Sequence, residues 1–185
     1  MKRTVLIFGL ISGGLMAAMM FGTLPFMDKI GFDRGEIIGY TSMVIAFLLV
    51  FFGIRSYREN VGGGYISFGR ALAVGLLITA ISTAMYVVAW EIIYFKVAPD
   101  FGEKYSAYYI NKLKATGISQ AELNVQIAKI NEFKQLYANP IFNGLITFLE
   151  PLPIGLIVTL ISALILRKRR PSVELSSPPL PGELA

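Results

Sequence analysis

Residues 4–26, TVLIFGLISGGLMAAMMFGTLPF, form a run without a single charged side chain. An α-helix needs about 20 apolar residues to cross a hydrocarbon core of about 30 Å. Lys2 and Arg3 precede the run, as basic residues precede the apolar core of a signal peptide. The run is longer than the usual signal-peptide core of about 7 to 15 residues, however, and no A-x-A cleavage site follows it. We therefore predict an uncleaved membrane-spanning helix.

Three further apolar stretches are long enough to cross a bilayer: about 37–54, about 68–94 and about 141–166. The third span carries Glu91 near its end, and the fourth contains Glu150. Charged residues make up only 16% of the chain, whereas soluble domains contain about 25%. The sequence thus predicts an all-α integral membrane protein, a four-helix transmembrane bundle that forms one domain over residues 1–170.

The chain has neither cysteine nor histidine, which excludes disulfides, thiolate nucleophiles, His or Cys metal sites and histidine acid–base catalysis. A membrane enzyme would need a carboxylate pair or a metal held by Asp and Glu, and no spacing here indicates one. We therefore expect a protein that is not an enzyme and has no cofactor or metal. The net charge of +5 does not predict a nucleic-acid partner, because the basic residues flank apolar runs and face lipid head groups.

Lysine and arginine clusters predict the orientation of the spans, since they concentrate on the cytoplasmic side. With a cytoplasmic N-terminus, all the dense clusters lie inside, beside anionic head groups; after Lys2 and Arg3 they comprise Arg55, Arg58, Arg70, Arg167, Lys168, Arg169 and Arg170. We expect a multi-pass protein of the bacterial inner (plasma) membrane with both termini cytoplasmic. The Pro- and Ser-rich tail, residues 171–185, is predicted to be disordered.

The long loop between the third and fourth spans is patterned. Ser119 and Glu122 have capping-box spacing, and Gly117 is suited to end a preceding helix. We predict a helical hairpin over about 96–139 on the extracytoplasmic side. Its Tyr-rich apolar face would either hold a ligand or partner, or pack down on its own membrane bundle.

Small residues recur at four-residue spacing in the first span, which contains Gly9-x-x-x-Gly13 and a second series of Gly14, Ala18 and Gly22. In lipid, such residues let helix backbones approach each other closely. They predict a compact bundle. A homodimer through the first span, or contact with another membrane partner, is an alternative use of the glycine face.

Glu150 is the first candidate for a functional side chain, because a carboxylate at membrane depth is costly. Asn143 and Thr147 fall on the same helical face and complete a polar stripe. Pro151 and Pro153 follow, and each frees a backbone carbonyl and favours a kink. Two interpretations stay open: the carboxyl group fixes helix packing at the kink, or it binds an ion or substrate.

Glu91 is the second candidate, but it lies within about one turn of the expected membrane surface, where water reaches it. If Glu91 met Glu150, the two could share a proton. The sequence does not place them together.

Several motifs resemble an uncharacterised family of bacterial membrane proteins, the domain-of-unknown-function family numbered 4199. The matching runs are GGYISFGRA (63–71), VGLLIT (74–79), WEIIY (90–94), PDF (99–101), FKQLYANP (133–140) and TFLEPLPIGL (147–156). The resemblance extends up to Arg170. It implies four spans with a long loop before the last, and it implies no activity, substrate or ligand.

Our leading functional hypothesis is a non-enzymatic scaffold or accessory protein of the inner membrane, which contacts lipid or partner proteins. The alternative is a small oligomeric proton-coupled transporter that uses Glu150, with or without Glu91.

Overall fold

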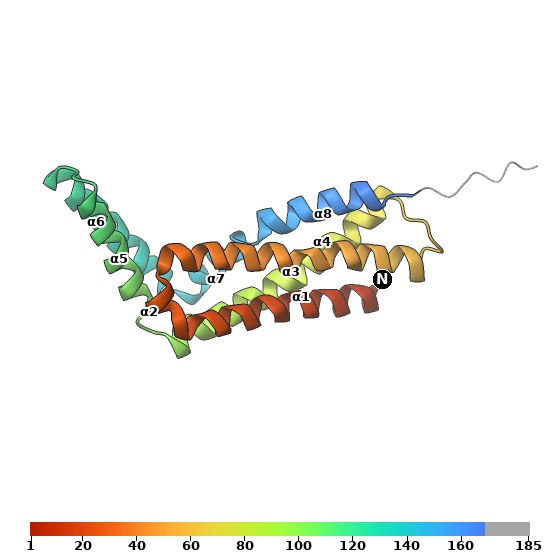
Figure 1. The fold of residues 1–185 in the computed structure, drawn as a ribbon, viewed down its shortest axis with the longest axis horizontal. Helices are drawn as coiled ribbons and strands as arrows, with labels where there is room; N and C mark the ends of the chain where they lie inside the picture. Colours follow the sequence, from red (N-terminus) through yellow and green to blue (C-terminus); the bar gives the residue numbers. More distant parts are fainter. Residues whose placement is uncertain (169–185) are drawn as a thin grey trace, which may run out of the picture.

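The computed structural model describes residues 1–168, so the predictions for Arg169, Arg170 and the tail 171–185 lie outside the described residues. The elements are α1 (Lys2–Thr23), a 3-10 turn η1 (Leu24–Phe26), α2 (Met27–Ile30), α3 (Phe32–Asn60), α4 (Phe68–Ile92), a π-helical turn η2 (Ile93–Val97), α5 (Phe101–Ala115), α6 (Gln120–Tyr137), α7 (Pro140–Leu149) and α8 (Leu152–Leu166). Figure 1 shows α1, α3, α4 and α8 running along the long axis, with α5 and α6 gathered at one end.

Four helical segments are long and apolar enough to cross a membrane: Lys2–Ile30, Phe32–Asn60, Phe68–Val97 and Pro140–Leu166. The prediction of an all-α membrane protein with four spans is confirmed. Large apolar side chains also face outward along these helices, including Leu10, Leu48 and Ile157. Such faces match a lipid environment, in which apolar exposure carries no cost.

The helix of the second span is longer than the apolar stretch predicted for it. α3 begins at Phe32 and ends at Asn60, beyond both limits of the predicted stretch 37–54. Hydropathy reports the part of a helix that lies in hydrocarbon, whereas the backbone hydrogen bonds continue until a residue interrupts them. Gly31, with a φ of +79°, precedes the helix and separates it from α2.

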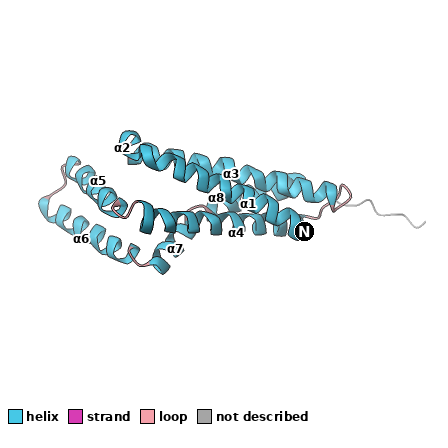
Figure 2. Ribbon diagram, turned by 90° about the horizontal axis from the view of Figure 1, so that it is seen from below, coloured by secondary structure: helices cyan, strands magenta, loops and turns pink. Residues whose placement is uncertain are grey.

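α4 is the central helix of the bundle and packs against α1, α3, α7 and α8. The side chains of Phe47, Val50, Ile54, Val74 and Ile78 are fully buried where α3 and α4 meet the other spans. Figure 2 shows the same helices from below, with α5 and α6 displaced from the long bundle.

Small residues bring α1 and α4 into close contact. A Cβ atom added at Gly9 would lie 2.8 Å from the Cβ of Ile81, and one at Gly13 would lie 2.7 Å from the Cβ of Met85. The Gly9–Gly13 face is therefore used within the chain. Ala18 and Gly22, on the second series, are exposed, so a homodimer through that side of α1 stays a prediction.

α4 and α8 cross at a matched pair of glycine and threonine contacts. Gly75 faces Thr159, and Gly155 faces Thr79. The Oγ1 atoms of the two threonines form a hydrogen bond of 3.0 Å in the buried interface. Each glycine gives the opposite threonine room to approach, as is common where membrane helices pack.

The fourth span is two helices rather than one kinked helix. α7 ends at Leu149 and α8 begins at Leu152, with Pro151 between them and Pro153 in the first turn of α8. Both prolines lack the N–H group that would continue the α7 hydrogen-bond ladder. Glu150 sits at this break, as the residue that ends α7.

Two helices, α5 and α6, occupy the loop before the fourth span and pack on each other as the α5–α6 pair. The Oγ of Ser119 accepts a hydrogen bond from the backbone N–H of Glu122 at 3.2 Å and begins α6. Gly117, with a φ of +71°, follows α5. The side of the membrane on which the pair lies stays a prediction.

Candidate functional site

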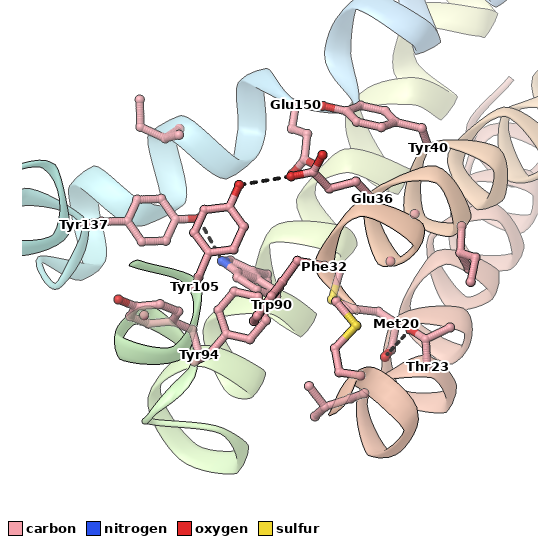
Figure 3. A pocket seen from close by; sticks show the side chains of 18 of the residues that line it. Met20, Thr23, Phe32, Glu36, Tyr40, Trp90, Tyr94, Tyr105, Tyr137 and Glu150 are labelled. Carbon is pink, nitrogen blue, oxygen red and sulfur yellow. Dashed lines mark hydrogen bonds between the residues drawn. The ribbon is translucent and has the colours of Figure 1, made fainter. Parts of the chain in front are cut away.

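A cavity of about 760 Å³ lies between the α5–α6 pair and the nearby ends of the spans. Figure 3 shows it from close by, with α1, α3, α4, α6 and α7 contributing side chains. Its lining is mainly methionine and aromatic and includes Met16, Met19, Met20, Met27, Met43, Phe32, Tyr40, Tyr86, Trp90, Tyr94, Phe101, Tyr105, Tyr109, Phe133 and Tyr137. Ligand cavities in proteins typically measure about 300 to 1,000 Å³ and are lined mostly by apolar and aromatic groups.

The break at Pro151 lies beside the cavity. α8 packs closely along both α3 and α4, whereas α7 packs on α4, α6 and α8. α7 has no comparable packing on α3, and its Ile146 is part of the cavity lining. Tyr86 of α4 and Glu150 at the end of α7 both line it.

Glu150 is held at the inner end of the cavity by a hydrogen bond. The hydroxyl of Tyr86 donates to the Oε2 of Glu150 at 3.0 Å. The tyrosine itself is buried, whereas Glu150 keeps accessible surface because it lines the cavity. Among residues 1–168, no lysine or arginine forms an ion pair with this carboxylate.

A second carboxylate, Glu36 of α3, faces the same cavity. The hydroxyl of Tyr105 on α5 donates to the Oε1 of Glu36 at 3.0 Å, as the dashed line in Figure 3 shows. Glu150 lines this cavity as well. The cavity thus has two acidic residues in its lining, one from α3 and one from the break after α7.

A hydrogen-bond network fastens α6 to α4 and α7. The indole N–H of Trp90 donates to the Tyr137 hydroxyl at 2.9 Å, and that hydroxyl also bonds to the Oγ1 of Thr147 at 3.0 Å. Thr147 donates to Asn143, whose amide donates to the Tyr137 carbonyl at 3.1 Å. These groups are satisfied by one another, so the network positions the wall of the cavity.

Asn139 begins α7 and sets its direction toward the cavity. Its Oδ1 accepts hydrogen bonds from the backbone N–H groups of Ile141 at 2.9 Å and Phe142 at 3.3 Å. Pro140 occupies the first helical position, where a missing N–H has no consequence.

We expect Asn139→Ala to lower the stability of the folded protein by about 1 kcal/mol, because both N–H groups lose their side-chain acceptor. Asn139→Asp is the matched variant and should retain wild-type stability, since a carboxylate accepts the same bonds and suits a helix N-terminus. Thermal unfolding in mild detergent measures both. Equal losses in the two variants would contradict the capping role.

Aromatic contacts and ion pairs hold α5 to the start of α3. Phe32 packs against the rings of Phe101, Tyr105 and Tyr108 with centroid distances of 5.7, 5.3 and 5.2 Å. Lys112 pairs with Asp33 at 2.8 Å, and the hydrogen bond that Lys112 donates to this carboxylate raises the pKa of Lys112. Exposed pairs of this kind add little energy. The aromatic cluster is therefore the main contact between α5 and α3.

The predicted polar stripe divides into two parts. Glu150 lines the cavity, whereas Asn143 and Thr147 are buried behind it in the Trp90–Tyr137 network. One end of the stripe thus lines the cavity, and the other end helps to hold α6 against α4 and α7.

Glu91 is not brought together with Glu150. It lies against Gly144 of α7, where an added Cβ atom would be 3.5 Å from the Oε1 of Glu91. It is not among the residues that line the cavity, and within residues 1–168 its Oε1 is buried without a hydrogen-bond partner.

The predicted basic residues that the structure describes gather at the opposite end of the bundle, where Figure 1 marks the N-terminus. Arg55 and Arg58 contact Glu59 at 3.0 and 3.3 Å. Arg70, Arg167 and Lys168 are exposed. The backbone of Lys168 pairs with Ile66, and its Nζ lies 5.4 Å from the centre of the Tyr65 ring.

Sequence reasoning missed the partners of Glu150. Tyr86, Trp90 and Tyr94 recur every four residues, a spacing that places them on one face of α4 and could have indicated a wall. Glu36 lies close in sequence to Asp33 and Arg34, as a charge outside the apolar stretch 37–54 would. Nothing in its local sequence indicates that α5 folds over it.

A known family matches residues 7–168, nearly the whole described chain, and its description reads "Protein of unknown function (DUF4199)". The chain belongs to the DUF4199 family. The resemblance found in the motifs is thereby confirmed. No curated protein and no solved structure matches the chain. For this DUF4199 member, function must therefore be argued from the cavity itself.

Proposed function

We propose that this DUF4199 protein is a non-enzymatic accessory protein of the bacterial inner membrane that binds a small amphiphilic molecule in the cavity beneath the α5–α6 pair. The observation that carries the proposal is the cavity of about 760 Å³, walled by methionine and aromatic side chains with a few polar groups among them. That combination suits a molecule with a long apolar part and a polar head.

The charge distribution supports the orientation in this proposal. Basic residues collect at the end of the bundle that lacks α5 and α6, including Lys2, Arg58 and Arg70. The positive-inside rule then puts this end and both termini in the cytoplasm. The α5–α6 pair and the cavity accordingly face the extracytoplasmic side, near the lipid head groups.

Trp90 makes the proposal directly measurable, because it is the only tryptophan and it lines the cavity. A bromine-tipped dodecanol added to the protein in lipid nanodiscs should quench Trp90 fluorescence in a saturable manner. Probe molecules that are only dissolved in the bilayer would instead give quenching that increases with probe concentration and does not saturate.

A cavity-filling variant supplies the control. Gly39 lines the cavity, and a Cβ atom added there meets nothing within 4 Å, so we expect the ring of Gly39→Phe to occupy part of the cavity. We expect saturable quenching to weaken at least about tenfold, equivalent to about 1.4 kcal/mol of binding free energy. Gly14→Phe adds the same ring at an equally open position outside the cavity and should bind as wild type does. The proposal would be contradicted if quenching of the wild type did not saturate and Gly39→Phe gave the same quenching.

A small oligomeric proton-coupled carrier is the second candidate function. The feature that favours it is Glu150, a carboxyl group at a break between two half-helices, which is a common setting for transport sites. Glu91 lies outside the cavity, so Glu150 would carry the proton without it. Glu150→Gln should then abolish proton-driven uptake by reconstituted vesicles. A binding protein would show no such uptake in either form.

A further inference from the structure

We infer that the amphiphile is a cation, whose positively charged head group lies between Glu150 and Glu36 while its apolar chain lies against the methionine and aromatic walls. This inference rests on the proposed function and specifies its ligand.

The first argument is the charge balance of the cavity. Glu150 and Glu36 each accept one tyrosine hydrogen bond, from Tyr86 and Tyr105 at 3.0 Å. Among residues 1–168, neither carboxylate has an ion-pair partner. Both residues keep accessible surface in the cavity. Two carboxylates that face one cavity repel each other, and a cation bound between them would relieve that repulsion. The cavity between them gives that charge a place to bind.

The lysines that line the cavity do not supply this charge. Lys134 is paired with Glu103, with its Nζ 2.9 Å from both carboxylate oxygens. Lys129 lies on α6 about 12 Å along the helix from Tyr137, at 1.5 Å per residue, toward the far end of the α5–α6 pair. The inner end of the cavity is therefore acidic.

The second argument is the aromatic lining. Trp90, Tyr94 and Tyr105 line the same cavity as the two acids, and Figure 3 shows their rings around it. The faces of such rings carry partial negative charge and attract cations, above all quaternary ammonium groups that cannot donate hydrogen bonds. An aromatic wall beside two carboxylates favours an alkylammonium over an anionic or neutral head.

The third argument concerns the rest of the ligand. Met16, Met19, Met20 and Met43 line the side of the cavity that α1 and α3 provide. Methionine is flexible and polarizable, so a wall of this kind adapts to alkyl chains of different shapes. The cavity lining therefore selects the charge of the ligand's head group more strongly than it selects the structure of the ligand's alkyl chain.

The experiment compares two bromine-tipped probes with the same alkyl chain, dodecyltrimethylammonium and dodecanol, by quenching of Trp90 in nanodiscs of zwitterionic lipid. Partition of each probe into protein-free nanodiscs is measured first, and each binding constant is corrected for it. We expect wild type to bind the cation at least about tenfold more tightly than the alcohol, as one close charge pair outside bulk water can provide. Glu150→Gln should reduce this preference about tenfold.

Thermal unfolding in mild detergent serves as the folding control for Glu150→Gln. Glu36→Gln is a second variant, expected to reduce the preference in the same direction. Equal binding of the two probes to wild type would overturn the cation assignment and leave the proposed function standing. A preference that survives in both variants would also overturn it. Failure of both probes to bind saturably would remove the proposed function and this inference together.

Discussion

Gly13→Ala is expected to destabilise the membrane bundle by about 2 kcal/mol, the cost of forcing extra atoms into a closely packed interface. The added methyl group would lie 2.7 Å from the Cβ and 2.8 Å from the Sδ of Met85. The sulfur can move, because methionine is flexible, but the Cβ is fixed to the backbone of α4. Relief therefore requires α1 and α4 to separate. Reversible unfolding in mixed micelles, followed by helical circular dichroism, measures the loss.

Gly14→Ala is the matched control, since it makes the same change at the next residue of the same helix. A Cβ atom at Gly14 meets nothing within 4 Å, and alanine favours the helix by about 1 kcal/mol over glycine. We expect wild-type or slightly higher stability. Equal losses in the two variants would contradict the packing of α1 through Gly13 and would instead support the predicted homodimer through the Gly14 side.

The spans could be predicted from the sequence because lipid imposes one simple requirement. Backbone groups in hydrocarbon must bond within a helix, and the helix must be long and apolar. The uncharged run 4–26 satisfies this without knowledge of any neighbour. The ends were less predictable: α3 continues through polar residues to Asn60, because helical hydrogen bonds do not stop where hydrocarbon does.

The site was only partly predictable, because its parts come from separate elements. Glu150 and the prolines after it are neighbours in sequence, so the break and the costly carboxylate could both be recognised. The bond from Tyr86 joins residues 64 positions apart, and the bond from Tyr105 to Glu36 joins residues 69 positions apart. A small-residue pattern such as Gly9 and Gly13 indicates which face of a helix packs, but not which helix it packs against.

The proline break relates the fold to the proposed function. A continuous fourth span would remain beside α3 and α4 along its length, as α8 does. By ending α7 at Leu149, the chain opens space beside α3 and leaves Glu150 at the end of that space. The same residue that makes the helix costly in lipid thus becomes accessible to a ligand.

Tyr137→Phe is expected to release the α5–α6 pair from the bundle. The hydroxyl of Tyr137 accepts the indole N–H of Trp90 at 2.9 Å and bonds to Thr147 at 3.0 Å. Thr147 retains its bond to Asn143, but Trp90 would lose its only hydrogen-bond acceptor among residues 1–168. An unsatisfied buried donor costs about 1 to 3 kcal/mol. A change of about 2 kcal/mol corresponds to a roughly thirtyfold larger population of the open form.

Hydrogen exchange in nanodiscs measures this release, because amides in residues 120–137 exchange when α6 separates from α4 and α7. Exchange should become roughly thirtyfold faster in Tyr137→Phe, by the same free-energy conversion, while the core of α4 is unaffected. Tyr65→Phe removes the same hydroxyl group at the opposite end of the bundle, where Tyr65 contacts Lys168 through its ring. It should leave exchange in α6 unchanged. Unchanged exchange in Tyr137→Phe as well would mean that the aromatic cluster around Phe32, and not the Tyr137 network, holds the pair over the cavity.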